Sequence, residues 1–201
     1  VLADTTGDAV LDRLQIQEPH PLVDETEYGL LLTGTLTTLA PAAELTLASA
    51  AEVIVIGNIR VQGSNSDLVI RSERFVYLEG EVEVTDSVSI LGGIRADGSY
   101  LDDPVTTHGS SVYIGSTGRV VTDDSGSAIT ISGARDVDLH GFLVAGGTLE
   151  ADGVAHNGVD ASIDVTAGEQ VFLNTALLAS GTVTVTSGTP GPDDTLAELF
   201  V

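Results

Sequence analysis

The chain of 201 residues has no cysteine, methionine, tryptophan or lysine, and only 4% of its residues are aromatic. The absence of cysteine excludes disulfides and thiolate metal sites. With so few rings, the hydrophobic core must consist of Val, Ile, Leu and Ala, which suits thin regular layers better than an irregular globule. No apolar run approaches the ~20 residues that a membrane-spanning helix needs, so we expect no membrane insertion.

Positive charge is scarce as well. Asp and Glu together number 30, against seven cations that are all Arg, and the formal net charge is −23. Binding to nucleic acid or to anionic lipid requires cations along the contact, so the composition predicts neither partner. The acidity is compatible with bound divalent cations and equally with a role in solubility alone.

An internal repeat organises residues 30–187. In each copy, apolar residues alternate with other residues, a Gly follows, and the alternation then resumes. The copies are LLLTGTLTTLA from Leu30, VIVIGNIRVQG from Val53, VYLEGEVEVTD from Val76, VSILGGIRADG from Val88, VDLHGFLVAGG from Val137 and VFLNTALLASG from Val171, in which Thr175 replaces the Gly. The first three copies lie 23 residues apart.

A second alternating element precedes four of the copies by a constant eight residues. Its members are Leu45 and Leu47, Leu68 and Ile70, Ile129 and Ile131, and Ile163 and Val165. Chance alternation would not hold one phase four times. The repeat unit therefore contains three short strands separated by turns.

Alternation with a period of two predicts strands that bury one face. Hairpin signals such as Asn-Gly are missing between neighbouring strands, which argues against an up-and-down antiparallel sheet. We predict an all-β fold, a right-handed parallel β-helix with three short strands per coil of about 23 residues and six to seven coils. The glycines at 34, 57, 80, 92 and 141 are expected at one corner, where they permit a φ that other residues avoid.

Two segments interrupt the repeat, at residues 98–110 and 146–161, and both are predicted to be loops that leave the coil. Residues 1–29 are interpreted as an N-terminal capping segment, with a short helix over 7–16. Residues 30–188 are the β-helix, and residues 189–201 are a Pro/Gly hinge with an apolar tail. The chain is expected to be a processed product or a segment of a longer protein.

The alternation, the corner glycines and the outward Thr, Ser and Asp resemble the β-helical shafts of large secreted bacterial adhesins of the filamentous-haemagglutinin type. The resemblance covers roughly residues 30–187 and concerns the style of the repeat. It implies a secreted or cell-surface protein with a structural or adhesive role and no cofactor. Its partners would be further copies of itself, other surface proteins or a polysaccharide.

Calcium is the one cofactor that the sequence suggests. Asp102 with Asp103, and Asp123 with Asp124, stand in Asp-rich turns that could place hard oxygen ligands around Ca²⁺. Neither an EF-hand spacing nor the calcium-binding nonapeptide of β-rolls is present. The four histidines show no ligand spacing, and His140 is expected to lie outward without a partner.

Catalysis on polysaccharides is the main alternative, because lyases and hydrolases also use this fold. A lyase would need a strong base, yet the chain has no Lys and only scattered Arg. A glycosidase would need two converging carboxylates, for which the same two Asp pairs are the candidates. We expect the chain not to be an enzyme, and keep a calcium-dependent carbohydrate-binding module as a further alternative.

Two features of the outer surface complete the predictions. Arg60, Arg71 and Arg95 are expected to pair with Glu79, Glu81 or Glu83 on adjoining coils. Phe75 and Tyr77 are out of phase with the inward residues, so we expect them to be either exposed or covered by a loop, and they are the first candidates for a partner-binding patch. With Tyr100 and Tyr113 they could form a strip on which sugars stack.

Overall fold

The computed structural model describes residues 2–4, 29–99, 110–150, 153–155, 158–188 and 198–200. Within these ranges all regular structure is β-strand, and no helix of membrane-spanning length occurs. The helix expected over residues 7–16 lies outside the described residues.

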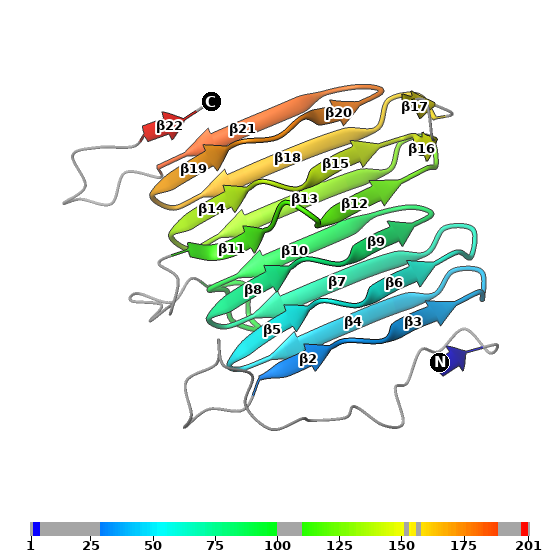
Figure 1. Ribbon diagram of the computed structural model, residues 1–201, viewed down its shortest axis with the longest axis horizontal. Coiled ribbons are helices and arrows are strands. Elements are labelled where there is room, and N and C mark those ends of the chain that lie inside the picture. Colours follow the sequence, from blue (N-terminus) through cyan, green and yellow to red (C-terminus); the bar gives the residue numbers. More distant parts are fainter. Residues whose placement is uncertain are drawn as a thin grey trace.

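The described chain winds as a right-handed parallel β-helix with three sheets (Figure 1). Sheet A contains β1 (Leu2–Asp4), β3 (Thr35–Thr38), β6 (Asn58–Val61), β9 (Glu81–Val84), β12 (Arg119–Thr122), β15 (Phe142–Ala145) and β20 (Leu177–Ala179). Sheet B contains β2 (Leu30–Leu32), β5 (Glu52–Val55), β8 (Phe75–Leu78), β11 (Ser110–Ile114), β14 (Asp136–Leu139), β19 (Gln170–Leu173) and β22 (Glu198–Phe200). Sheet C contains β4 (Glu44–Ser49), β7 (Asp67–Ser72), β10 (Val88–Gly92), β13 (Ala128–Gly133), β18 (Ser162–Ala167) and β21 (Val183–Ser187).

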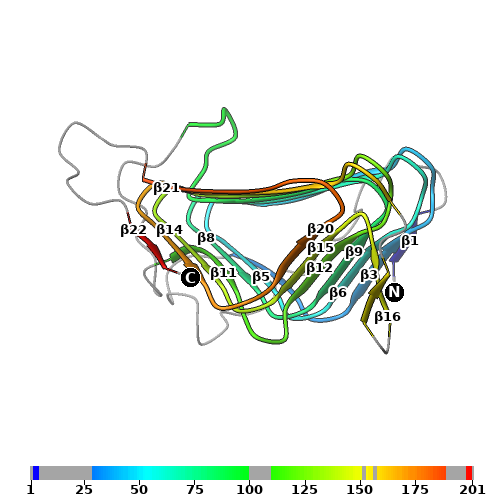
Figure 2. The same ribbon diagram turned by 90° about the horizontal axis from the view of Figure 1, so that it is seen from above.

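The three sheets enclose one core. Seen along the axis, sheet C forms a flat side, and sheets A and B slope toward each other on the opposite side (Figure 2). Each coil contributes one strand to each sheet, in the order B, A, C. Sheets of seven, seven and six described strands confirm the predicted three strands per coil and six to seven coils.

Apolar side chains stack in columns along the axis, and the register of sheet B shows this most simply. One column consists of Val53, Val76, Val112, Val137 and Val171. Every one of these side chains is 0% exposed. Each valine covers the ones above and below it, so no coil has a core of its own.

The spacing along the chain varies although the column is straight. Successive valines lie 23, 36, 25 and 34 residues apart. The two long spacings contain the two predicted interruptions, which leave the coil at different corners. One follows β10. The other follows β15 and contains an antiparallel hairpin, β16 (Thr148–Glu150) and β17 (Gly153–Ala155).

The corner glycines are explained by crowding between coils rather than by φ. Gly34, Gly57, Gly80 and Gly141 lie in the turns from sheet B to sheet A, and positive φ values occur at other glycines. A Cβ on Gly80 would overlap the carbonyl oxygen of Gly57, and a Cβ on Gly57 would overlap that of Gly34. The predicted corner is therefore right for these four, but the reason given for it is wrong.

The prediction is wrong for Gly92 and the copy from Val88, because both lie in sheet C. Val88 pairs with Leu68 and Ile129 in sheet C, and Gly92 pairs with Ser72 and Gly133 at the end of the same strands. Strands of all three sheets alternate in the same way, so the motif alone does not identify the sheet. The fixed lead of eight residues does, and Val88 lacks it.

Replacing Gly80 by Ala is expected to destabilise the fold by about 1–3 kcal/mol, because the new methyl group meets backbone atoms that cannot move aside. Gly34→Ala is the matched control, because it occupies the same corner of the first coil with open space around it. Thermal and urea unfolding of both variants would measure the difference. Equal melting temperatures for the two variants would contradict the crowding explanation.

Candidate functional site

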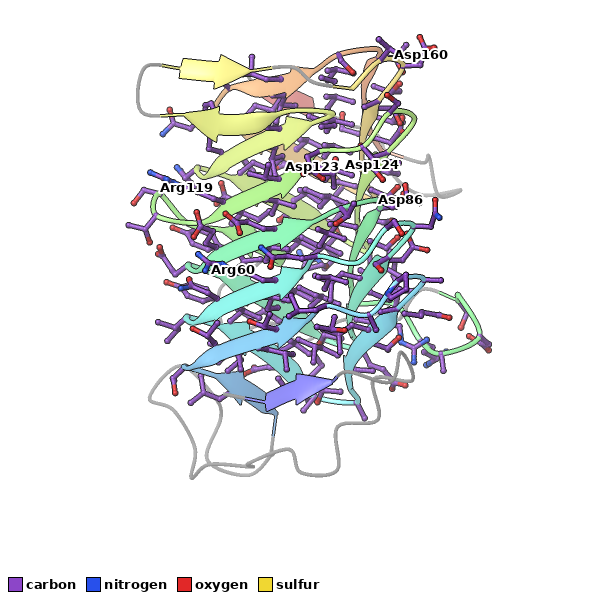
Figure 3. The ribbon with its side chains drawn as sticks, turned by 90° about the vertical axis from the view of Figure 1, so that its right-hand side faces the viewer. Arg60, Asp86, Arg119, Asp123, Asp124 and Asp160 are labelled. Carbon is purple, nitrogen blue, oxygen red and sulfur yellow. The ribbon has the colours of Figure 1, made fainter. Side chains whose placement is uncertain are left out.

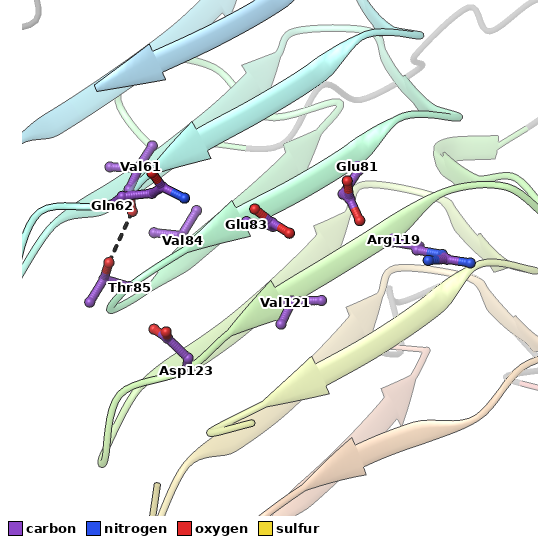
Figure 4. A pocket seen from close by; sticks show the side chains of 9 residues that line it. All are labelled: Val61, Gln62, Glu81, Glu83, Val84, Thr85, Arg119, Val121 and Asp123. Carbon is purple, nitrogen blue, oxygen red and sulfur yellow. Dashed lines mark hydrogen bonds between the residues drawn. The ribbon is translucent and has the colours of Figure 1, made fainter. Parts of the chain in front are cut away.

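The outer face of sheet A carries a groove with a volume of about 300 Å³. It is lined by Val61, Gln62, Glu81, Glu83, Val84, Thr85, Arg119, Val121 and Asp123 (Figure 4). Its charged residues come from β9, from β12 and from the turn after β12. Three carboxylates and one guanidinium therefore face the same open hollow.

Arg60 is the cation that holds the two glutamates of this groove. Its Nε lies 3.1 Å from Glu83 Oε2, and its Nη2 lies 3.5 Å from Glu81 Oε2. This confirms the predicted pairing between coils for Arg60. All three side chains are partly exposed, so each ion pair contributes at most about 1 kcal/mol.

The third carboxylate of the groove is Asp123, at the corner between sheets A and C. Asp123 and Asp124 lie together at that corner, away from Arg60 and Arg119 on the open face (Figure 3). Asp123 is exposed, yet partial loss of its hydration, followed by repulsion from Asp124, raises its pKa. The Asp124 backbone N–H donates to the Thr85 carbonyl at 2.9 Å, which fixes the turn on the coil below.

The geometry does not build the predicted calcium site from the residues that it describes. Among them, no three His, Asp or Glu side chains are grouped as metal ligands. Asp102 and Asp103 lie outside the described residues. Calcium binding at Asp123 and Asp124 stays a prediction.

Sheet A has a covered portion beside the groove. Val121 and Val144 point outward, since Val120 and Leu143 are their inward neighbours, but they are only 7% and 0% exposed. The backbone of β16 lies against β12 at this place, outside sheet A (Figure 2). The hairpin therefore borders the groove on the side of the later coils.

An aromatic column runs over the outer face of sheet B. Tyr77 and Tyr113 are register partners, and their rings stack with centroids 5.2 Å apart and planes 7° apart. The His140 ring follows, 5.6 Å from the Tyr113 ring. Tyr100, the further aromatic expected here, lies outside the described residues.

Of the two alternatives predicted for Phe75, the structure shows a covered residue and not an exposed one: Phe75 is only 1% exposed, and its ring lies 6.1 Å from the Tyr77 ring. Phase along a strand tells which face a side chain points to, but not whether that face is covered. Tyr77 remains partly exposed. The stacked rings of Tyr77 and Tyr113 cover one face of each other, and the tilted rings of Phe75 and His140 follow at either end, which disfavours the stacking of a sugar on this column.

Glu79 ties this column to the next coil. It accepts hydrogen bonds from the Tyr77 hydroxyl at 2.9 Å, from the Thr117 N–H at 3.3 Å and from the Thr117 hydroxyl. Partial burial, then the bond to Glu79 and its charge, raise the pKa of Tyr77 to about 12. Burial also acts to raise the pKa of Glu79, but these hydrogen bonds outweigh it and the net shift is downward.

His140 has partners, contrary to expectation. Its Nε2 lies 2.8 Å from Asp138 Oδ1, and its Nδ1 lies 3.1 Å from Asn174 Nδ2. Asp138 comes from the same strand end and Asn174 from the coil above. The contact with Asn174 cannot be read from the sequence, because Asn174 is 34 residues away and the length of the intervening insertion hides the register.

Comparisons of the chain with protein-family models, with curated proteins and with solved structures found no match. Fold and surface together define the class: a parallel β-solenoid with an acidic groove on one sheet and an aromatic column on another.

Glu79→Ala is expected to lower the pKa of Tyr77 toward that of a free tyrosine, because a carboxylate and a hydrogen-bond acceptor both leave the hydroxyl. Alkaline titration of the tyrosinate absorbance would follow the shift. Glu73→Ala is the control, since Glu73 is not among the groups that shift this hydroxyl. Superimposable curves for Glu79→Ala and wild type would contradict the assignment.

Asp136→Asn is expected to stabilise the chain by about 0.5 kcal/mol at pH 7. Partial burial, then repulsion from Glu169, raise the pKa of Asp136, although Arg135 opposes this. A carboxyl whose pKa is higher in the folded state destabilises the fold while it is ionised. This loss of stability disappears as the pH falls through the pKa of the folded state.

The advantage of Asp136→Asn should therefore vanish in acid. Melting temperatures of the variant and wild type between pH 3 and pH 8 would test this. Asp164→Asn, on the outer face of sheet C, is the control. A stabilisation that persists unchanged below about pH 4, the ordinary range of a carboxyl, would contradict the electrostatic cause.

Proposed function

We propose that this chain is a non-catalytic structural and adhesive module of a secreted or cell-surface bacterial protein, of the filamentous-haemagglutinin style. Its work is to hold a stiff rod and to present loops. The observation that carries the proposal is the unbroken apolar column through five successive coils, from Val53 to Val171 in sheet B.

The outer surface supports a structural role, because charged side chains are used to connect coils. Arg60 bridges to Glu83 on the next coil, and Arg135 Nε bridges to Glu169 Oε1 at 2.9 Å, 34 residues along the chain. Such pairs are modest individually, but repeated along the axis they fix the register between coils.

The two insertions are the parts best placed to meet a partner. One leaves at the corner between sheets C and B after β10, and the other includes the hairpin β16–β17. Residues 93–99 of the first insertion and the hairpin of the second extend beyond the regular coil (Figure 2). On this proposal the rod sets their spacing, and the partners are surface proteins or further copies of the chain.

The groove on sheet A favours a second candidate, a carbohydrate-active role. Glycosidic hydrolysis needs one carboxyl that keeps its proton and a second carboxylate across the bond. Asp123 has a raised pKa, and Glu81 and Glu83 lie in the same groove. A calcium-dependent carbohydrate-binding module would instead use Asp123 and Asp124 as ligands.

Turnover of uronic-acid polymers and neutral glycans separates the two candidates. We expect that the purified chain releases no product from any of these glycans. Product that is lost in Asp123→Asn and retained in Asp86→Asn, one coil below at the same corner (Figure 3), would establish the enzyme instead.

Calcium dependence is tested by melting the chain in millimolar Ca²⁺, in Mg²⁺ and in chelator. The structural role predicts that Ca²⁺ and Mg²⁺ act alike, through screening of the acidic surface. A calcium-specific rise in melting temperature that Asp124→Asn abolishes would support the calcium-dependent module.

A further inference from the structure

Tyr77 and Tyr113 bring two phenol rings into contact across two consecutive coils. They are register partners in the parallel strands β8 and β11, which hold them side by side at the spacing of a sheet. The ring planes are within 7° of parallel, and the ring centroids lie 5.2 Å apart. Both side chains are partly exposed on the outer face of sheet B, so small solutes have access to the pair.

Neighbouring side chains hold the two rings in this arrangement. The buried ring of Phe75 lies 6.1 Å from the Tyr77 ring, and the His140 ring lies 5.6 Å from the Tyr113 ring. His140 Nε2 in turn lies 2.8 Å from Asp138 Oδ1. A tyrosine ring that turned away from the stack would displace one of these neighbours, so the packing maintains the contact between the rings.

The composition of the chain directs oxidation to tyrosine. Thiol, thioether and indole groups are oxidised about as readily as phenols or more so, and they would give up electrons to a nearby radical. The chain has no Cys, Met or Trp, so none of these groups competes with its four tyrosines. An oxidant that removes an electron from this chain therefore takes it from a phenol ring, and two of the phenol rings are in contact.

A proton acceptor lies beside one of the two phenols. A phenol that loses an electron becomes a strong acid, so it is oxidised more easily where a base is in place to take its proton. Glu79 Oε1 accepts a hydrogen bond from the Tyr77 hydroxyl at 2.9 Å. Glu79 is also partly exposed, so it can pass the proton on to water.

We propose that Tyr77 and Tyr113 are a site of oxidative cross-linking, at which a one-electron oxidant joins the two rings into a dityrosine. Each ring loses one electron and its phenolic proton. The two phenoxyl radicals then form a carbon–carbon bond between ring positions ortho to the hydroxyls, and the hydrogens of these two carbons return to the oxygens through water. In total, two electrons pass to two equivalents of the oxidant, and two protons pass to the solvent.

The product would tie two coils together around the first insertion. Tyr77 and Tyr113 lie 36 residues apart, and a covalent bond between them restrains the unfolded chain as a disulfide does. The chain has no Cys, so a disulfide cannot supply such a bond. The inference goes beyond the proposed structural role and does not depend on it, because the cross-link is measured directly on the purified chain.

The test is photo-oxidation of the purified chain by a ruthenium tris-bipyridyl complex with persulfate, a one-electron oxidant small enough to reach partly exposed rings. Dityrosine fluorescence should rise while the chain stays monomeric on a denaturing gel, because coupling within one molecule does not depend on protein concentration. Cleavage after arginine separates residues 75–95 from residues 96–119. Mass spectrometry should find these two peptides joined, with the loss of two hydrogen atoms.

Two variants and one condition are the controls. Tyr113→Phe keeps the ring but removes the phenol, so it should lose the joined peptide, whereas Tyr100→Phe in the same peptide should retain it. In concentrated urea the yield should fall severalfold, because the register between β8 and β11 is lost. The oxidised wild-type chain should melt about 5–10 °C higher than the untreated chain, because the cross-link closes a long loop.

Four results would overturn the inference: no joined peptide, an equal yield from Tyr113→Phe, an equal yield in urea, or covalent dimers as the main product. None of these results bears on catalysis or on calcium binding, which the glycan turnover assay and the melting experiments decide separately. Failure of the cross-link is thus distinguishable from failure of the structural role.

Discussion

The shelter that each coil receives from its neighbours is the interaction on which the molecule depends. A column such as Val53, Val76 and Val112 has no bulky member, and each valine alone would cover little surface. Stacked at the spacing of a parallel sheet, the side chains exclude water along the whole axis. Val183, which stands in the same column as Leu45 and lies in the edge strand of sheet C, is by contrast 45% exposed.

The architecture could be predicted from the sequence, because burial between neighbouring coils requires apolar residues at regular positions along the chain. The fixed lead of eight residues from Leu68 to Val76 identifies two consecutive sheets, and the glycine within each copy marks the turn to the third. The phase failed at Val88, where an insertion follows and the lead is lost. Apolar alternation alone is the same in every sheet of a solenoid.

The surface was less predictable, for a related reason. Glu79 and Thr117 are 38 residues apart, and their contact depends on how much chain the first insertion removes from the coil. The burial of Phe75 depends on what covers sheet B, which no pattern within the strand records. Only Arg60 and its glutamates, in coils of the regular length, followed from spacing.

The straight columns with unequal spacing along the chain also indicate where the molecule tolerates insertions and deletions. Val112 stands directly above Val76 although 36 residues separate them. The stacking of one coil on the next therefore does not depend on how many residues leave the coil at a corner. New loops can therefore be acquired or lost at these corners without moving the coils on either side. The columns of the core and the loops at the corners are therefore structurally independent of each other.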